Sequence, residues 1–229
     1  GPTRCLGHPG NPPPSGIGGI VTTFEERQLL RQSVAALVSK HATSEANRRA
    51  MDSVTGYDEA LWSMLCEQVG VAALVVPEEI GGAGGELADA AAVLEELGRA
   101  LVPTPLLGTT LAELALLAAD EPDGETIERL AAGTAIGAVV FDRDYVINGD
   151  VADVVLAVDD ARIVRWAEVS IAAAHTLDPT RRLARVTPGA CTTIGNDPGI
   201  ADTAAILLAA EQVGAAARCL ELTVEYTKQ

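Results

Sequence analysis

Apolar residues recur at steps of three and four along most of residues 22–134, which is the spacing of one face of an α-helix. The first segment begins as a capping box does: Thr22 or Thr23 caps the helix, and Glu25 or Glu26 follows three residues later. Its expected inward face carries Leu30, Val34 and Leu37, and His41 falls on the same face at the helix end, where we expect it to be solvated or to interact with the helix dipole rather than to bind a ligand. We therefore predict an N-terminal helical domain over residues 22–134, with helices at 22–42, 44–52, 57–70, 87–98, 105–120 and 124–133.

The pattern changes near residue 135, where short valine-rich runs alternate with Asp, Asn and Gly. This alternation is typical of strands joined by turns, and Asn148–Gly149 and Asp159–Asp160 are the predicted turns. Trp166 and Tyr145 are expected to pack in the core or on the surface of this region. We predict a reduced middle β domain over residues 135–200, which is short for a complete sandwich or barrel.

Helical spacing returns over residues 201–229, and apolar positions follow at steps of four and three. Such a seam is typical of a helix packed in a bundle, and at 1.5 Å per residue this helix would be about 40 Å long. We interpret residues 201–229 as the start of an incomplete C-terminal helical bundle, so the sequence reads as unfinished at Gln229. The predicted class is mainly α with a small β domain (α+β). The seam residues are Ile206, Ala210, Val213, Ala217, Leu220 and Val224.

Composition narrows the functional classes. The chain has 229 residues, 48% of them hydrophobic, and a formal net charge of −16. This charge repels nucleic acid and anionic lipid, so neither partner is expected. We expect no apolar run long enough to cross a membrane and find no signal-peptide order, which favours the cytoplasm. Residues 1–21 are interpreted as a disordered leader or, in part, a cloning remnant.

The four cysteines are far apart and form no CxxC pair, and there are three histidines. This spacing predicts no metal site and favours a reducing compartment in which the cysteines act as small core residues. The residues concerned are Cys5, Cys66, Cys191, Cys219, His8, His41 and His175.

Four glycines within Gly81–Gly85 precede a helix and raise the question of a phosphate loop. A Walker loop requires Lys and then Ser or Thr after its last glycine, whereas Glu86 and Leu87 follow here. The Gly-x-Gly-x-x-Gly register of a Rossmann fold does not fit either. Nearby carboxylates would repel an anion but suit the positive end of the following helix. We expect a flexible turn that lets two helical segments approach closely.

The stretch "LWSMLCEQVGVAALVVPEEIGGAGGELADAAAVLEELGRA" resembles the N-terminal helical domain of acyl-CoA dehydrogenases. Three later blocks are similar to other parts of that family: "YVINGDVADVVLAV", "TLDPTRRLARV" and "LLAAEQVGAAARCLELTVEYTKQ". Together the resemblance covers about residues 22–229. The positions that match the first pattern are Trp62, Gly70, Pro77, Glu78, Gly81, Gly82, Gly84, Glu95, Leu97 and Gly98.

The resemblance implies a helical domain, a small β domain and a C-terminal four-helix bundle. It also implies an FAD-dependent reaction that removes hydrogens from Cα and Cβ of an acyl-CoA thioester, with a carboxylate as the base. The sequence departs from the family where "LAAGTAIGAVVFDRDYVING" omits the block that normally cradles the flavin. Ala204 and Ala205 stand where some members carry the catalytic Glu and Arg, and the chain stops before a later flavin-contacting stretch.

These departures predict the reduced partner in a heteromeric enzyme, as in bacterial steroid degradation. A homologous catalytic subunit would hold most of the FAD, the assembly would be α2β2, and this chain alone would be inactive. The alternatives are a non-catalytic scaffold without FAD or substrate, and a homomeric dehydrogenase whose C-terminal part is missing from this sequence and which supplies the flavin block unusually. Expression of the chain alone should give no yellow protein.

No catalytic residue is assigned in this chain, its cofactor-binding residues are unknown, and no metal ligand is predicted. Glu211 on the last helix is expected to be solvated or paired, and His175 to be structural. Arg181 and Arg182 would contact a CoA phosphate or, in the interpretation that we prefer, face water on an edge strand.

Overall fold

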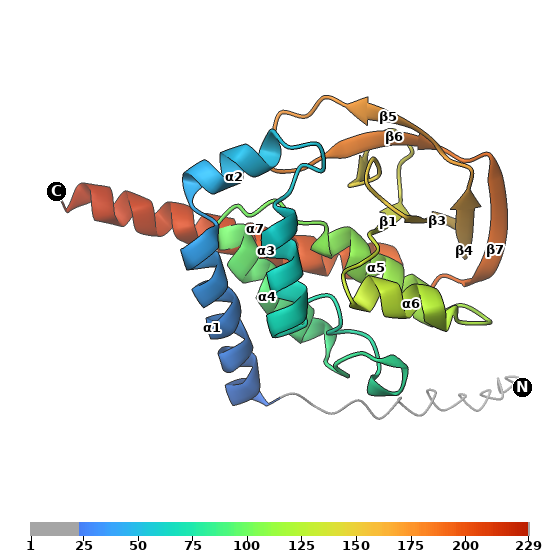
Figure 1. Ribbon diagram of the computed structural model, residues 1–229, viewed down its shortest axis with the longest axis horizontal. Coiled ribbons are helices and arrows are strands. Elements are labelled where there is room, and N and C mark those ends of the chain that lie inside the picture. Colours follow the sequence, from blue (N-terminus) through green and yellow to red (C-terminus); the bar gives the residue numbers. More distant parts are fainter. Residues whose placement is uncertain (1–22, 229) are drawn as a thin grey trace, which may run out of the picture.

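A computed structural model describes residues 23–228, so Cys5, His8 and the predicted leader lie outside the described residues. Helices come first, strands follow, and a long helix crosses both groups (Figure 1). This order confirms the α+β class. The elements are α1 Phe24–His41, α2 Ser44–Met51, α3 Glu59–Met64, η1 Leu65–Val69, η2 Glu78–Ile80, α4 Leu87–Arg99, α5 Leu106–Leu117, α6 Gly124–Ala131, β1 Gly137–Val140, β2 Val146–Ile147, β3 Val154–Asp159, β4 Arg162–Ala167, β5 Ser170–Ala174, β6 Leu183–Thr187, β7 Ala190–Asn196 and α7 Ile200–Thr227.

Helix α1 begins with the predicted capping box. The Thr23 hydroxyl accepts a hydrogen bond from the Glu26 backbone N–H, and the Glu26 carboxylate accepts one from the Thr23 backbone N–H. These two bonds satisfy donors that a helix start otherwise leaves unpaired. Of the predicted inward face, Val34 is fully buried.

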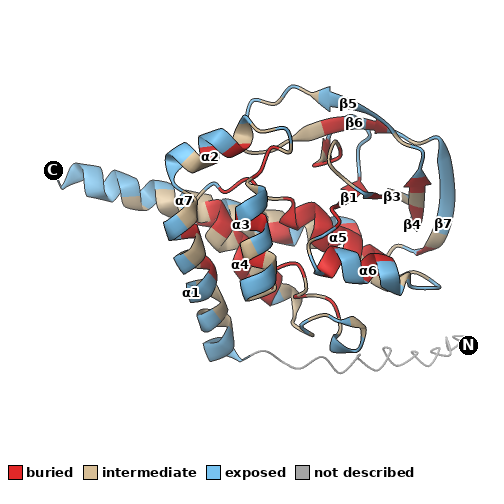
Figure 2. Ribbon diagram, viewed as in Figure 1, coloured by how far each residue is buried: buried red, intermediate tan, exposed pale blue. Residues whose placement is uncertain are grey.

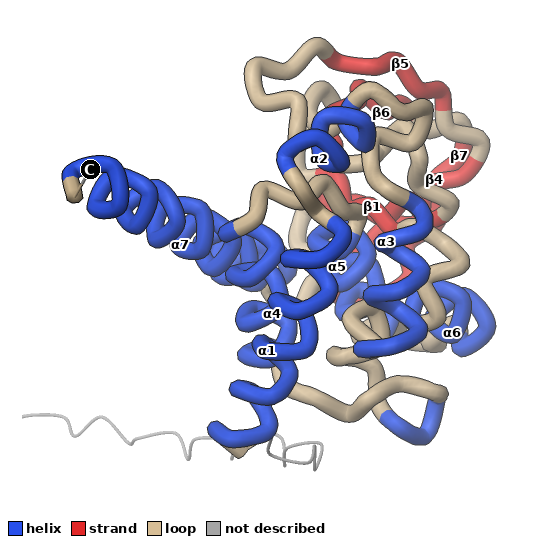
Figure 3. Tube along the Cα trace, turned by 60° about the vertical axis from the view of Figure 1, so that its left-hand side comes forward, coloured by secondary structure: helices blue, strands red, loops and turns tan. Residues whose placement is uncertain are grey.

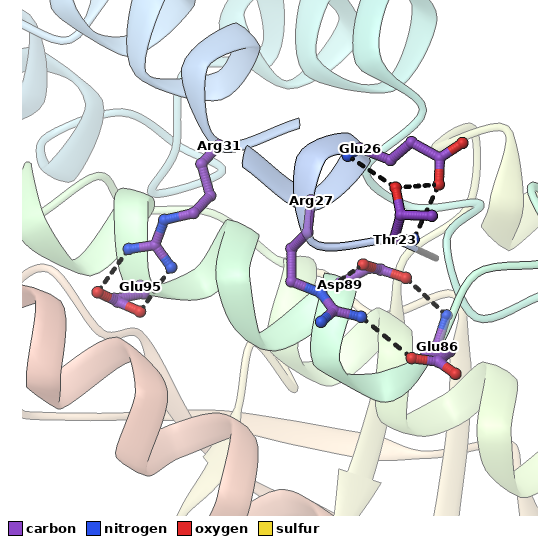
Figure 4. Close-up of polar contacts among 7 residues, drawn as sticks. All are labelled: Thr23, Glu26, Arg27, Arg31, Glu86, Asp89 and Glu95. Carbon is purple, nitrogen blue, oxygen red and sulfur yellow. Dashed lines mark hydrogen bonds and ion pairs between the residues drawn. The ribbon is translucent and has the colours of Figure 1, made fainter. Parts of the chain in front are cut away.

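Ion pairs join α1 to α4 (Figure 4). The Arg27 guanidinium donates to Asp89 at 2.8 Å and to Glu86 at 3.0 Å, and Arg31 donates to Glu95 at 2.7 Å. The hydrogen bond from Arg31 lowers the pKa of the Glu95 carboxyl. Glu86 and Asp89 also close a capping box at the start of α4, at the helix end where the sequence led us to expect favourable carboxylates.

The Gly81–Gly85 segment packs against the preceding turn. Backbone N–H groups of Ala83, Gly84 and Gly85 donate to the carbonyls of Ala73, Val76 and Leu74 at 2.8–2.9 Å. A Cβ at Gly82 would lie 1.9 Å from the Val76 carbonyl oxygen, so this approach requires glycine. The close approach is therefore between the glycine segment and the preceding turn, held by backbone hydrogen bonds, and not between two helical segments as predicted.

Two small sheets form the β region, in the orders β1-β3-β4-β7 and β2-β6-β5. Strands β1 and β3 pair in parallel, and the other pairs are antiparallel. Alternate residues face opposite sides: Val139 and Leu156 join the helical core, whereas Val140 and Val155 join a second core that includes Trp166. Tyr145 is 63% exposed.

The β3–β4 hairpin turns at Asp160–Ala161, one residue later than predicted, because Asp159 pairs with Arg162. Both turn residues have positive φ, as a two-residue hairpin of type I′ requires. The other predicted turn is confirmed: Asn148 has φ +54° and precedes Gly149.

Helix α7 packs on α4 and α5 and then projects beyond them (Figures 1 and 3). Its inward face carries Ile200, Leu207 and Gly214, which are spaced seven residues apart. We did not predict that this face makes the contact with α4 and α5. Four residues of the predicted seam are instead exposed, with Ile206, Val213, Leu220 and Val224 41–66% accessible, while Ala210 and Ala217 are half-buried. The outer turns are accordingly coloured as exposed in Figure 2. Helix α7 is therefore apolar on two faces and covered on one.

The sequence prediction was wrong on two further points. Helix α7 is long and apolar enough to cross a membrane by length and composition, although we had expected no such segment. Cys191 and Cys219 are exposed instead of lying in the core, while Cys66 packs against the core. Burial raises the pKa of the Cys66 thiol to about 12.

Candidate functional site

A narrow crevice lies where the helices, the β region and α7 meet. Its volume is about 20 Å³, room for one water molecule. Apolar side chains from α4, α5 and β2 form one side, and polar groups from the loop before β6 and from α7 form the other. The lining residues are Leu94, Val102, Thr104, Leu107, Ile147, Asn148, Thr180, Arg181 and Glu211.

An ion pair closes the polar side of the crevice. Arg181 Nη2 lies 2.7 Å from Glu211 Oε2, and both side chains are largely buried, with 27% and 21% exposed. The pair joins the β region to α7 across 30 residues of sequence. Glu211 is therefore paired, one of the two states expected for it.

The neighbouring arginine holds the same loop to the helical region. Arg182 forms an ion pair with Asp150, and its Nη1 donates to the carbonyls of Ser53 at 3.2 Å and Val54 at 2.7 Å. A Cβ at Gly56 would lie 1.8 Å from Arg182 Cδ, so the side chain occupies the space that this glycine leaves open. Arg181 and Arg182 thus fix one loop to two different parts of the chain.

The edge-strand interpretation of these arginines is wrong. Both precede β6, and β6 is the central strand of its sheet, between β2 and β5. Each guanidinium is already paired with a carboxylate. A CoA phosphate at either arginine stays a prediction, and it would have to compete with that carboxylate.

A second, wider pocket of about 300 Å³ lies on the outer face of the β region. Tyr145, His175 and the Asp144–Arg185 ion pair line it, opposite three alanines of β5. His175 is thus separate from the crevice. Among residues 23–228 no group of three or more His, Cys, Asp or Glu side chains is placed to hold a metal ion.

The two cavities do not fit a flavin dinucleotide. The crevice has room for one water, and the outer pocket is at the lower limit for an ordinary drug-sized ligand, which is smaller than FAD. The turn between β1 and β2 spans residues 141–145 and lies in the stretch where the family resemblance predicts that the flavin block is deleted. At the start of α7, Ala204 is partly buried and Ala205 is exposed, and an alanine cannot take a proton.

Two features escaped the sequence analysis. The Arg181–Glu211 pair was missed because nothing in the local sequence links residues so far apart. Glu113 on α5 is 0% exposed, and a signal for it existed: it is the only acid in the apolar run "PLLGTTLAELALLAA". Neither oxygen of Glu113 has a hydrogen-bond partner among the described residues.

Residues 24–134 match the model of the acyl-CoA dehydrogenase N-terminal domain. The chain is 64% identical over 208 residues to the acyl-CoA dehydrogenase IpdE2 of Mycobacterium tuberculosis strain H37Rv. That match covers 91% of this chain but 65% of the relative, so the chain spans about two thirds of the relative's length.

Two solved structures share the fold. One is the Tcur3481–Tcur3483 steroid ACAD G363A variant, with a TM-score of 0.76 and 24% identity. The other is the ChsE4–ChsE5 complex from Mycobacterium tuberculosis, with a TM-score of 0.71 and 24% identity. Each match covers 90% of this chain and 67% of the matched chain. At this identity the likeness establishes the fold alone.

Proposed function

Because the chain belongs to the acyl-CoA dehydrogenase family, we propose that it is the reduced subunit of a heteromeric, FAD-dependent acyl-CoA dehydrogenase. The complex would introduce a Cα=Cβ double bond into an acyl-CoA thioester in steroid or lipid catabolism. A homologous catalytic subunit would supply the base and most flavin contacts, in an α2β2 assembly in the cytoplasm. The domain limits proposed are 22–134, 135–200 and 201–229.

One observation carries this proposal: residues 24–227 keep the family order of helices, strands and a long helix, but neither of the two cavities described above fits a flavin dinucleotide. The crevice between the three parts has room for one water molecule, and the Arg181–Glu211 ion pair is part of its lining. The alanines at 204 and 205 offer no base. One solved structure with this fold, the ChsE4–ChsE5 complex, contains two differently named chains, and an assembly of unlike subunits is the setting that we propose for this chain.

The exposed apolar stripe of α7 supports an assembly as well. Val213 and Leu220 lie on it and are 57% and 66% exposed, whereas Leu207 on the inward face is fully buried. We propose that this stripe packs against further helices of a C-terminal bundle. The membrane alternative fits α7 less well, because its charged residues make ion pairs: Arg99 of α4 pairs with Glu221, and Arg181 pairs with Glu211.

The main test is co-expression with a catalytic acyl-CoA dehydrogenase subunit from the same genome. The expected product is a complex whose intact mass accounts for both chains. Its flavin absorbance should correspond to the FAD held by the catalytic subunit, and it should oxidise a steroid acyl-CoA. The chain expressed alone should be colourless and inactive. If the solitary chain contains stoichiometric FAD and oxidises an acyl-CoA, the proposal is wrong.

A pair of variants on α7 separates assembly from folding. Val213→Glu places a charge on the exposed stripe and should prevent recovery of the complex while the helical circular dichroism of the chain stays unchanged. The control Gln212→Glu adds the same charge at the adjacent exposed position, which points away from the stripe. Equal recovery with both variants would argue for the scaffold alternative, in which α7 carries no obligatory partner.

A further inference from the structure

Helix α5 buries a carboxyl group that no other feature of the fold explains. Glu113 has no exposed surface, and both of its side-chain oxygens lack a hydrogen-bond partner within residues 23–228. Burying a charged carboxylate without a partner is very unfavourable, whereas burying a neutral carboxyl costs far less. We propose that Glu113 makes the packing of α5 depend on a proton: α5 stays in place while Glu113 is protonated and loosens when Glu113 ionises.

No neighbouring charge offsets the ionised form. Cys66 of η1 is the titratable group whose charge interacts with Glu113, and its negative thiolate would only add repulsion. Strand β1, which packs on α5, carries no titratable side chain. The charged residues of α4, α6, α7 and β3 are either exposed or paired elsewhere; they are Asp89, Glu95, Glu96, Arg99, Glu125, Glu128, Arg129, Asp159, Asp202, Glu211, Arg218, Glu221 and Glu225.

Loosening of α5 would reach the rest of the molecule through direct contacts. The Thr109 hydroxyl accepts a hydrogen bond from the Gly137 N–H of β1 at 3.2 Å, one turn before Glu113. A Cβ at Gly108 would lie 2.7 Å from the Gly137 carbonyl oxygen, so the helix and the strand are in close contact. Leu107 lines the crevice. The proton on Glu113 therefore controls the helix that joins the helical region, the β region and the crevice.

The direction of the pH dependence follows from burial. Desolvation raises the pKa of Glu113 well above its ordinary value of 4.5, so the folded chain binds this proton more tightly than the unfolded chain. The contribution of the group to stability is therefore fully present below the ordinary pKa and is lost as pH rises through the raised one. Over that interval the unfolding equilibrium constant gains about tenfold per pH unit from this one group.

Urea unfolding of the full chain at a series of pH values from 5 to 9 tests the linkage. Wild type and Glu113→Gln share every other titrating group, so the ratio of their unfolding constants isolates Glu113. The unfolding constant of wild type divided by that of Glu113→Gln should rise with pH, by up to about tenfold per pH unit. If Glu113→Gln does not fold, Glu113→Leu serves in the same comparison and should be more stable than wild type at pH 8. A ratio that is constant over the whole range would overturn the proposal.

A second measurement reports local loosening under native conditions. Cys66 is close enough to Glu113 for the two charges to interact, and its labelling by a thiol reagent can be followed after Cys5, Cys191 and Cys219 are replaced by serine. Labelling of wild type should increase with pH more steeply than labelling of Glu113→Gln, which carries the same thiol. Parallel labelling curves would refute the loosening of α5 even if global stability changed.

Discussion

Replacing a glycine at the crossing of α4 and α7 should destabilise the fold, because the two backbones leave no room there for a side chain. At this crossing each helix presents a glycine to the backbone of the other. A Cβ at Gly214 would lie 1.9 Å from the Glu95 carbonyl oxygen, and a Cβ at Gly98 would lie 2.1 Å from the Glu211 carbonyl oxygen. The change is Gly214→Ala, and Gly98→Ala tests the same contact from the other side.

The loss of unfolding free energy can be worked out from the room that the methyl group lacks. Ordinary contact begins at 3.4 Å, so a Cβ at Gly214 falls short by 3.4 − 1.9 = 1.5 Å. The obstructing atom is backbone, so the helices themselves must move apart. A gap of about 1 Å forfeits a quarter to a half of each dispersion contact along the seam, and overpacking costs about 1–3 kcal/mol. Alanine returns about 1 kcal/mol of helix propensity. With the upper overpacking figure, the net loss is about 2 kcal/mol.

Urea unfolding followed by circular dichroism at 222 nm measures this loss. Gly124→Ala in α6 is the control, because nothing lies within 4 Å of a Cβ there; it should be neutral or should stabilise by up to about 1 kcal/mol. The double variant Gly98→Ala/Gly214→Ala should lose less than the sum of the single changes, since one displacement accommodates both methyl groups. If Gly214→Ala is as stable as wild type, the reasoning from close approach is refuted.

Three further predictions can be checked by the same unfolding assay. Ala161→Gly relieves a positive φ of +61° in the β3–β4 turn and should stabilise by up to about 1 kcal/mol; destabilisation would contradict the turn geometry. Arg182→Ala leaves the largely buried Asp150 without its ion pair and should cost about 2 kcal/mol, whereas a loss below about 0.5 kcal/mol would mean that the pair is not formed. Asp123→Asn should cost about 1 kcal/mol at neutral pH, allowing for solvent screening. Hydrogen bonds from Thr126 and, second, from Arg165 lower the Asp123 pKa from 3.8 to about 2. The difference in unfolding free energy between the variant and wild type should therefore vanish as pH falls through that range. A difference that persists at pH 1.5 would exclude this cause.

Local chemistry in the sequence predicted the helices well. The capping box at Thr23 and Glu26 and the apolar spacing of α4 are set by residues within four positions of one another. The Asp160–Ala161 turn was displaced by one residue because strand pairing with Arg162, not the Asp-Asp pair, fixes the hairpin register. Periodicity also found the outer face of α7 but not the inner one, because an apolar helix has no polar side to mark which face is buried.

The residues of the crevice were harder to predict from the sequence than the helices were. Arg181 and Glu211 were each noted, but their pairing depends on how the loop before β6 meets α7. The edge-strand interpretation failed because strand order within a sheet is a tertiary property: β6 lies between β2 and β5, which come before it in the chain. The family resemblance, by contrast, rests on ordered motifs, and the matched relatives support it.

The chain has two tryptophans, and the fold gives one to each core. Trp62 is buried among the helices, and its indole N–H donates to the Gly133 carbonyl at 2.9 Å. Trp166 lies in the second core, with the Arg143 guanidinium 5.1 Å from its ring. Intrinsic fluorescence therefore contains two separable reporters, and single-tryptophan chains with Trp62→Phe or Trp166→Phe would record when each core forms. Whether the β region folds with the helices or after them thus becomes an optical measurement that needs no added label.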